Sequence, residues 1–158
     1  MFTQKGTYAL GFSCASTASV QVGALGLLRL NPGWVIYIGS AFGSGGLRGR
    51  LRHHLSSRAA PRWHLDYLRP YLSPRQLWYS LDPQPQEHAW AAACLALPGA
   101  VIPLRRFGAS DCACPSHLVY YPQQPLFSSF LAVLPEIAPG QISPGVLEFG
   151  KNEYPQIS

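Results

Sequence analysis

The chain has 158 residues, a length typical of a single domain. With 47% hydrophobic and only 12% charged residues, it has enough apolar side chains for a sizeable core and not the composition of a disordered protein. The 15 glycines and 15 prolines argue against a helical bundle or coiled coil and favour short elements joined by many turns.

No apolar run approaches the roughly 20 residues that a membrane-spanning helix requires. The segment Met1–Ala9 has neither the basic-then-apolar order nor the cleavage site of a secretory signal. We therefore expect a cytoplasmic protein without a membrane partner, whose four cysteines are reduced thiols.

The net charge of +5 is unevenly distributed along the chain. Seven of the twelve lysines and arginines fall within 28 residues, where Asp66 is the only acid. Such clustering suits a phosphate-bearing partner, although a solvated basic face would give the same pattern. The seven are Arg48, Arg50, Arg52, Arg58, Arg62, Arg69 and Arg75.

The first predicted elements are strands. The chain opens with a strand at Thr7–Phe12, and two short runs follow at Ser19–Val22 and Leu27–Leu30. A turn at Asn31–Gly33 then leads into the β-rich run Trp34–Gly39. This pattern predicts a β meander with a hairpin between its first and last strands.

Helical spacing begins after the glycine-rich segment 43–46. Three leucines spaced four residues apart predict a helix over Leu47–Leu55 that packs on the sheet, with Arg50 and His54 along another line of it. A second helix is expected from Trp63 to Leu68 or Leu72, where Pro70 kinks or ends it.

The remaining elements alternate between strands and one helix. The runs Gln76–Leu81, Ala100–Phe107 and Leu118–Tyr121 are predicted strands, and the alanine-rich run Glu87–Leu97 is a predicted helix. Prolines are scattered through the weakly charged residues 122–158. We therefore divide the chain into a domain, residues 1–121, and an appendage, residues 122–158, that wraps on the domain or is partly disordered.

Several short motifs follow one another in a recognisable order. Gly6-Thr7-Tyr8 precedes Tyr37-Ile38-Gly39, a helix carrying Arg50 and His54 comes next, and Glu87 lies on a later helix. This ordered set resembles the GIY-YIG nuclease superfamily over roughly residues 6–121. The segments 63–68 and 108–118 look like an uncharacterised branch of that superfamily, sometimes fused to repair enzymes of the endonuclease III type.

The resemblance implies an α+β fold, a small antiparallel or mixed β-sheet flanked by short helices, with a β-hairpin inserted between the two tyrosine motifs. It implies a metal-dependent endonuclease that hydrolyses a DNA phosphodiester, including in structured or branched DNA, in repair or DNA processing. The implied catalytic residues are Tyr8, Tyr37, Arg50, His54 and Glu87, and Glu87 would hold Mg²⁺ or Mn²⁺. The arginines expected to bind nucleic acid are Arg48, Arg52, Arg58 and Arg62.

These residue types suit phosphodiester cleavage, which needs an attacking water and neutralisation of the phosphoryl charge. One carboxylate can hold Mg²⁺ while waters and the phosphate complete its octahedron. Arg50 can direct two donors at one phosphate. The resemblance assigns proton acceptance to Tyr37, oriented by Tyr8, and a phenol with a pKa near ~10 can do this only if a nearby cation lowers that value.

Some assignments have alternatives. Arg48 competes with Arg50 for the phosphate, and we choose Arg50 because Leu47 and Leu51 bracket it. The asparagine that follows the glutamate in many members has no counterpart here. These residues could also have purely structural roles. The two tyrosines could be core aromatics, and His54 could lie on the helix surface. Glu87 could be a carboxylate at a helix N-terminus, where it would stabilise the helix by ~0.3–1 kcal/mol. Asp66 could pair with Arg62 or Arg69.

The loop before the last predicted strand contains Cys112, Cys114 and His117, which with Cys14 or Asp111 could form a four-ligand zinc site. Because Cys-x-Cys spacing is uncommon in such sites, we favour a loop held by hydrogen bonds from Ser110, Asp111 and Ser116.

Three function classes remain. Residues 43–46 lack a Walker-type Gly-Lys-Ser/Thr ending, so no nucleotide cofactor is expected. The first class is the endonuclease, and the second is a catalytically inactive nucleic-acid-binding module on the same fold. The third is a protein-interaction or structural domain with a solvated basic face.

Overall fold

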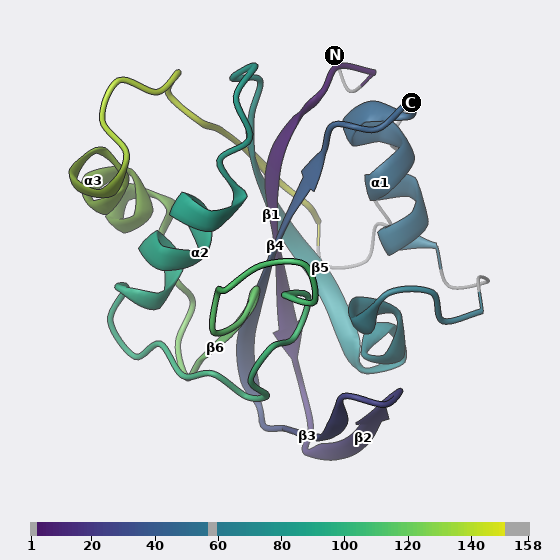
Figure 1. The fold of residues 1–158 in the computed structure, drawn as a ribbon. Helices are drawn as coiled ribbons and strands as arrows, with labels where there is room; N and C mark the ends of the chain where they lie inside the picture. The colour runs from purple at the N-terminus through teal and green to yellow at the C-terminus, as the bar shows by residue number, and fades with distance from the viewer. Residues whose placement is uncertain (1–2, 57–59, 151–158) are drawn as a thin grey trace.

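A computed structural model describes residues 3–56 and 60–150 of the chain. A five-stranded sheet in the order β6-β4-β1-β5-β7 lies between two layers of helices (Figure 1), which confirms the predicted α+β class. All of its strand pairs are antiparallel. Within the described ranges, no helix has the length and apolarity to cross a membrane. The elements are β1 (Gly6–Cys14), β2 (Ala18–Val22), β3 (Gly26–Leu30), β4 (Gly33–Ala41), α1 (Gly46–Leu55), the 3₁₀ turns η1 (His64–Tyr67) and η2 (Arg69–Tyr71), β5 (Leu72–Ser80), α2 (Glu87–Leu95), β6 (Leu118–Tyr121), α3 (Phe127–Ile137) and β7 (Gly145–Glu148).

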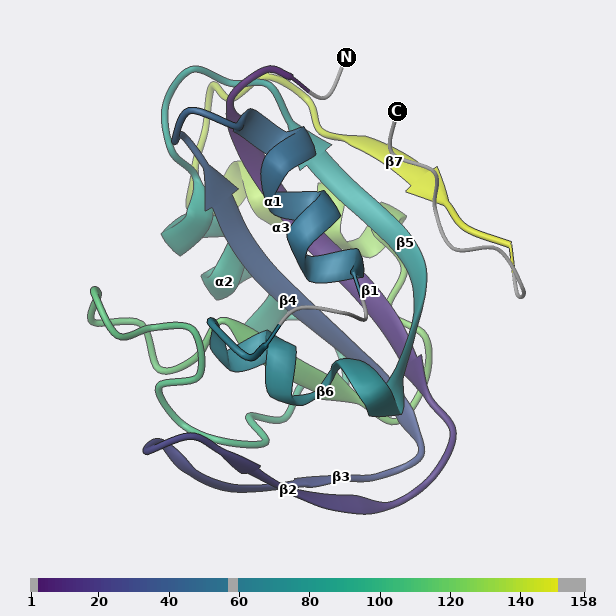
Figure 2. The same ribbon diagram turned by 90° about the vertical axis from the view of Figure 1, so that its right-hand side faces the viewer.

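The pairing of β1 with β4 is the centre of the sheet. Tyr8 lies opposite Gly39 and Leu10 lies opposite Tyr37 in this ladder, so the two tyrosines are diagonal neighbours. The hairpin β2–β3 forms a separate two-stranded sheet at one end of the molecule (Figure 2), which confirms the predicted insert. Because β2 and β3 form a sheet of their own, the insert lets two motifs with 28 residues between them lie on adjacent strands.

Each face of the sheet has its own apolar cluster. Tyr8, Leu10 and Tyr37 face α1, whose Leu47, Leu51 and Leu55 are buried as predicted. Ile36 and Ile38 face the other way, onto α2 and α3. Because β1 is buried on both faces, its sequence shows little alternation of apolar and polar residues.

Two predicted elements are wrong. Instead of a strand at Ala100–Phe107, only Val101 makes a bridge, to Tyr120, because Pro103 has no N–H to donate and the chain turns at 105–108. The second predicted helix is instead the two short 3₁₀ turns η1 and η2, with Pro70 inside the second. Strand β5 then begins at Leu72, and the shift in its pairing register with β1 falls between Gly11 and Phe12.

The described part of the segment after Tyr121 completes the fold rather than being disordered. Helix α3 packs on α2, where the rings of Phe130 and Trp90 lie 4.9 Å apart between centroids. Strand β7 pairs with β5 and covers that edge of the sheet. Apolar residues of this segment, such as Phe130 and Leu134, therefore belong to the core.

The other edge of the sheet is only partly covered. Strand β6 pairs with β4 over Trp34–Tyr37, and one further hydrogen bond joins the Ile38 amide to the His117 carbonyl. Beyond that point, no strand among residues 3–56 and 60–150 pairs with this edge of β4 at Gly39–Ala41. At this open edge of β4, side chains from the two faces of the sheet can lie close to one another.

Candidate functional site

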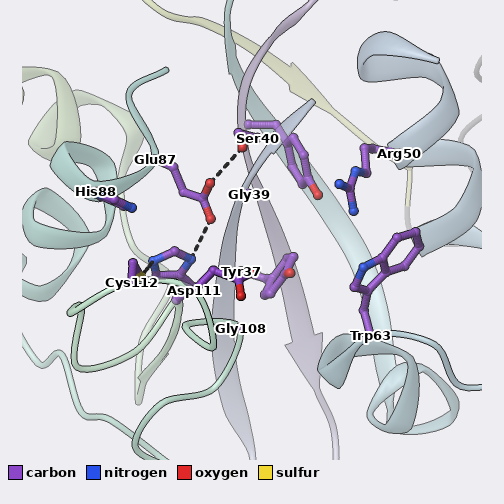
Figure 3. Close-up of a pocket in the computed structure, with 12 residues that line it drawn as sticks. Tyr37, Gly39, Ser40, Arg50, Trp63, Glu87, His88, Gly108, Asp111 and Cys112 are labelled. Carbon is purple, nitrogen blue, oxygen red and sulfur yellow. Dashed lines mark hydrogen bonds and ion pairs between the residues drawn. The ribbon is translucent and has the colours of Figure 1, made fainter. Parts of the chain in front are cut away.

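A cavity of about 240 Å³ lies beside the open edge of β4. Tyr37 and Arg50 line it from the α1 face, while Ser40 and Glu87 line it from the α2 face (Figure 3). Tyr8, which belongs to the apolar cluster on the α1 face, also lines it. Gly39, Trp63, His88 and the loop before β6 supply the rest of the wall. Its lining is mainly polar, which suits a charged ligand better than an apolar one.

The structure brings the five predicted catalytic residues into one region. Four of them line the cavity directly: Tyr8, Tyr37, Arg50 and Glu87. His54 lies behind Tyr8, fully buried, with its Nε2 2.8 Å from the tyrosine hydroxyl. The reading of His54 as a helix-surface residue is therefore wrong, because α1 turns this side chain onto the sheet.

The two phenols are buried apart from the ends that reach the cavity. Tyr8 is 1% exposed and Tyr37 is 7% exposed, and their ring centroids lie 6.5 Å apart. Burial raises the pKa of both hydroxyls, and Arg50 lowers it by too little to compensate. The lowered pKa that proton acceptance by Tyr37 requires is therefore not present in the protein alone, and both residues are neutral phenols at neutral pH.

A chain of polar groups runs from Tyr8 to Asp66 through His54. Burial lowers the pKa of His54 although Asp66 raises it, so this imidazole is neutral at pH 7. Its Nδ1 faces Asp66 Oδ1 at 3.9 Å. The carboxylate favours the proton on Nδ1, which leaves Nε2 to accept a hydrogen bond from the Tyr8 hydroxyl.

Asp66 is held in place by donors other than the ones expected. Its Oδ2 accepts hydrogen bonds from the amides of Arg62 and Trp63, at 2.8 and 2.9 Å, and lies 2.9 Å from His53 Nε2. Burial raises the pKa of Asp66, but its hydrogen bonds outweigh burial and keep that pKa well below the ordinary range. Asp66 therefore anchors η1 to α1, a role that the sequence did not reveal.

Glu87 is the first residue of α2 and points toward the same cavity (Figure 3). The Ser40 hydroxyl donates to Oε2 at 2.7 Å, and His117 Nδ1 lies 2.7 Å from Oε1. Burial raises the pKa of Glu87, but the hydrogen bonds from His117 and Ser40 lower it by more than burial raises it. The group is therefore a carboxylate at neutral pH. Ser40 adjoins the second motif, but nothing in the sequence linked it or His117 to Glu87.

Arg50 reaches the cavity beside an aromatic ring. Its Cζ lies 4.6 Å from the centroid of Trp63, and Arg62 Cζ lies 5.0 Å from the same ring. Arg48, the rival for the phosphate contact, does not line this cavity. A second cavity of about 220 Å³, along the glycine-rich segment, also has Arg50 and Trp63 in its wall.

The basic cluster is less uniform than the sequence suggested. Arg52 and Arg62 are exposed, and Arg62 packs on the ring of Trp63, which lines the cavity. Arg58 lies outside the described residues. Arg69 is buried and donates to the Leu55 carbonyl, and Arg75 donates to the Ser13 hydroxyl. Arg69 and Arg75 thus stabilise the fold through these hydrogen bonds.

A cluster of possible metal ligands borders the cavity. His88 of α2 joins Cys112, Cys114 and His117, and their ligand atoms all lie within 4.8 Å of one another. Neither of the two possible fourth ligands, Cys14 or Asp111, belongs to this cluster. Cys14 is buried in β1, where its thiol contacts the Ser16 carbonyl. Burial and the neighbouring Cys112 raise the pKa of the Cys114 thiol to about 11. Of the expected loop-bracing residues, Ser116 bonds to both polar backbone atoms of Leu118.

Comparisons with known proteins identify a family for this chain but assign no function to it. Neither the curated proteins nor the solved structures contain a significant match to this chain. The model of one protein family, described as "Domain of unknown function DUF123", matches residues 7–137, which includes α3 and extends past residue 121. The chain therefore belongs to the DUF123 family.

Proposed function

We propose that this protein is a divalent-metal-dependent endonuclease of the GIY-YIG type that hydrolyses a phosphodiester bond in DNA. One observation carries the proposal: two phenols, a guanidinium and a carboxylate meet in one cavity from opposite faces of the sheet. Arg50 in the cavity wall and the exposed Arg62 on the Trp63 ring favour a polyanionic substrate.

The residues present fit a hard divalent cation at Glu87. This side chain is ionised, 24% exposed and directed at the cavity, and Asp111 lines the same wall. Each Glu87 oxygen already has one protein partner, but a carboxylate oxygen offers two lone pairs, so a monodentate bond to a metal remains available. A bound cation would neutralise phosphoryl charge and lower the pKa of a coordinated water.

Arg50 is the group that would hold the scissile phosphate. Its position against Trp63 limits the conformations of a long side chain, so less entropy is lost when the guanidinium binds a phosphate. The same ring offers a face on which a nucleobase can stack. Tyr37, whose hydroxyl end reaches the cavity, would donate a hydrogen bond to a phosphoryl oxygen.

Proton transfer is assigned to Tyr8 and His54 rather than to Tyr37. Water attacks phosphorus while the bond between phosphorus and the leaving sugar oxygen breaks. The water's proton passes to the Tyr8 oxygen as the Tyr8 proton passes to His54 Nε2, 2.8 Å away. The imidazolium that forms is stabilised by Asp66, whose carboxylate faces Nδ1. This coupled transfer avoids a free phenolate, which burial makes unfavourable.

The test is DNA cleavage by purified protein with Mn²⁺, on branched, nicked and single-stranded substrates. Glu87→Gln is expected to abolish cleavage without unfolding the protein, and Tyr37→Phe to reduce it. Glu136→Gln, an exposed position on α3, is the matched control and should cleave normally. Absence of cleavage on every substrate, or undiminished cleavage by Glu87→Gln, refutes the proposal.

The second candidate is a DNA-binding module without turnover. It is favoured by the neutral state of both phenols and by the two protein partners of Glu87. This candidate predicts DNA affinity that falls steeply with salt, because neutralised phosphates release counterions, and no cleavage under any condition. Arg52→Ala and Arg62→Ala should each make that salt dependence shallower.

A further inference from the structure

We propose that His88, Cys112, Cys114 and His117 bind one Zn²⁺ in a closed tetrahedral site that fastens the loop before β6 to helix α2. The four ligand atoms already lie within 4.8 Å of one another, although they come from segments more than 20 residues apart. None of the four ligands is assigned to the proposed nuclease chemistry, and the zinc site stands without that chemistry, although Glu87 contacts His117.

The observed spacing suits tetrahedral zinc. With Zn–S near 2.3 Å and Zn–N near 2.0 Å, a sulfur and a nitrogen on one zinc lie about 3.5 Å apart. Cys112 Sγ and His117 Nε2 are 3.4 Å apart. Binding would require only small movements of the other two side chains, since none of the four atoms lies farther than 4.8 Å from another.

The hydrogen bonding of His117 also suits a metal ligand. Its Nδ1 lies 2.7 Å from Glu87 Oε1, while Nε2 points at Cys112. A carboxylate on the far nitrogen of a zinc-bound histidine sets its tautomer and increases its basicity. Glu87 therefore acts on this site as a positioning residue.

The ligand types select the metal. Two thiols and two imidazoles favour Zn²⁺ over Mg²⁺ or Mn²⁺, which prefer oxygen ligands. Four protein ligands leave no position for substrate, so the role is structural. Both cysteines are free thiols, as this ligation needs.

The conformation of the loop before β6 would be stabilised by a zinc ion that connects it to α2. It contains little regular structure, and Arg106 adopts a positive φ of 68°, which is unfavourable for a residue with a side chain. Gly108 of this loop also lines the cavity beside the open edge of β4. Its amide donates a hydrogen bond to His64 Nδ1. Zinc would thus hold one wall of the cavity against α2.

The first measurement is metal content of the full chain after purification under reducing conditions. We expect about one zinc per chain, since one ion satisfies all four ligands. Replacement by Co²⁺ should give the intense visible bands of tetrahedral cobalt and the near-ultraviolet thiolate-to-cobalt bands. A protein that takes up neither metal, or whose Cys112 and Cys114 form a disulfide under these conditions, overturns the proposal.

Variants then identify the ligands by competition with a chromophoric chelator. Cys112→Ser, Cys114→Ser and the exposed-site variant His88→Ala should each lower zinc affinity by more than about 100-fold, whereas Glu87→Gln should lower it about 10-fold. Cys14→Ser is the matched control and should keep the wild-type affinity. If His88→Ala keeps the wild-type cobalt spectrum and affinity, or if Cys14→Ser loses them, the proposed ligand set is wrong. None of these readouts depends on DNA cleavage, so the zinc site and the nuclease can fail separately.

Discussion

Tyr8 lies directly opposite Gly39 in the β1–β4 ladder, and its ring occupies the space that a side chain at residue 39 would need. A Cβ built on Gly39 would come within 2.6 Å of Tyr8 Cζ. The glycine of the second motif is therefore required by packing: it lets a buried phenol cross the neighbouring strand. It also keeps the open edge of β4 free of a side chain where the cavity begins.

Gly39→Ala is expected to displace the Tyr8 ring and break its hydrogen bond to His54. Overpacking of this kind lowers the free energy of unfolding by about 1–3 kcal/mol, and DNA cleavage should fall with it. Urea denaturation measures the first effect. Gly49→Ala is the control: a Cβ there meets nothing within 4 Å, and alanine in a helix should leave stability unchanged or raise it. Equal unfolding free energies for the two variants would contradict this packing role.

The two tyrosine hydroxyls should differ in their effect on stability. Tyr8→Phe removes the partner of a fully buried histidine nitrogen, so the free energy of unfolding should fall by about 1–3 kcal/mol. The Tyr37 hydroxyl has no hydrogen bond to another described residue, and Tyr37→Phe should change stability by less than about 0.5 kcal/mol. Chemical denaturation of both variants decides the matter, and a reversed order would refute the Tyr8–His54 bond.

Stability should fall below neutral pH because of His54. Burial keeps its folded-state pKa below the unfolded value near ~6.5, so between these two values the unfolded chain binds a proton that the folded protein excludes. The loss begins as pH drops through ~6.5 and is at most about 1.4 kcal/mol per pH unit. The ionisable groups near His54 are Tyr8, Tyr37, Arg50, His53 and Asp66.

His54→Gln tests this pH dependence. Unfolding free energies measured between pH 5 and pH 8 should decline less steeply in the variant than in the wild type. The range excludes the region below pH ~4, where Asp66 loses its own stabilising contribution as its depressed pKa is approached. Parallel curves for the two proteins would show that His54 does not titrate differently on folding.

Trp63 should matter for DNA affinity through the arginines that it supports. Trp63→Ala removes the ring beside Arg50 and Arg62, and the loss of one exposed cation–π contact, about 0.5–1 kcal/mol, corresponds to about two- to fivefold weaker binding. Fluorescence anisotropy with labelled DNA at low salt measures the change. Trp63→Phe, which keeps an aromatic face, should restore most of the affinity, and an unaffected Trp63→Ala protein would remove the ring from the proposed interface.

Local patterns predicted much of the fold. The leucine spacing of α1, the β-rich runs of β1 and β4, and the hairpin between them all follow from short-range periodicity and turn residues. The segment 100–117 was predicted poorly, because its course depends on distant partners such as His64 and on a positive φ at Arg106 rather than on a repeating pattern.

The sequence identified several residues of the candidate site but not the contacts between them. Tyr8, Tyr37, Arg50 and Glu87 could be chosen from motif order, whereas Asp66 and His88 could not be given their roles. Asp66 has an arginine on either side in sequence, which suggested an ion pair, yet its oxygens receive backbone amides and histidines. His88 stands alone in the sequence and meets the Cys112–His117 cluster only because α2 packs beside that loop.

The sequence by itself determined the elements with a clear local pattern, such as β1, β4 and α1, and the residue types that are available for chemistry, because those properties depend on neighbours along the chain. The tertiary structure decided that β6 begins opposite Tyr37 while β4 continues to Ala41, which leaves an open edge where groups from both faces of the sheet meet. It also decided that burial keeps both phenols protonated while hydrogen bonds keep Glu87 and Asp66 ionised. Desolvation and hydrogen bonding between residues far apart in the chain exist only after packing, so no local pattern encodes them.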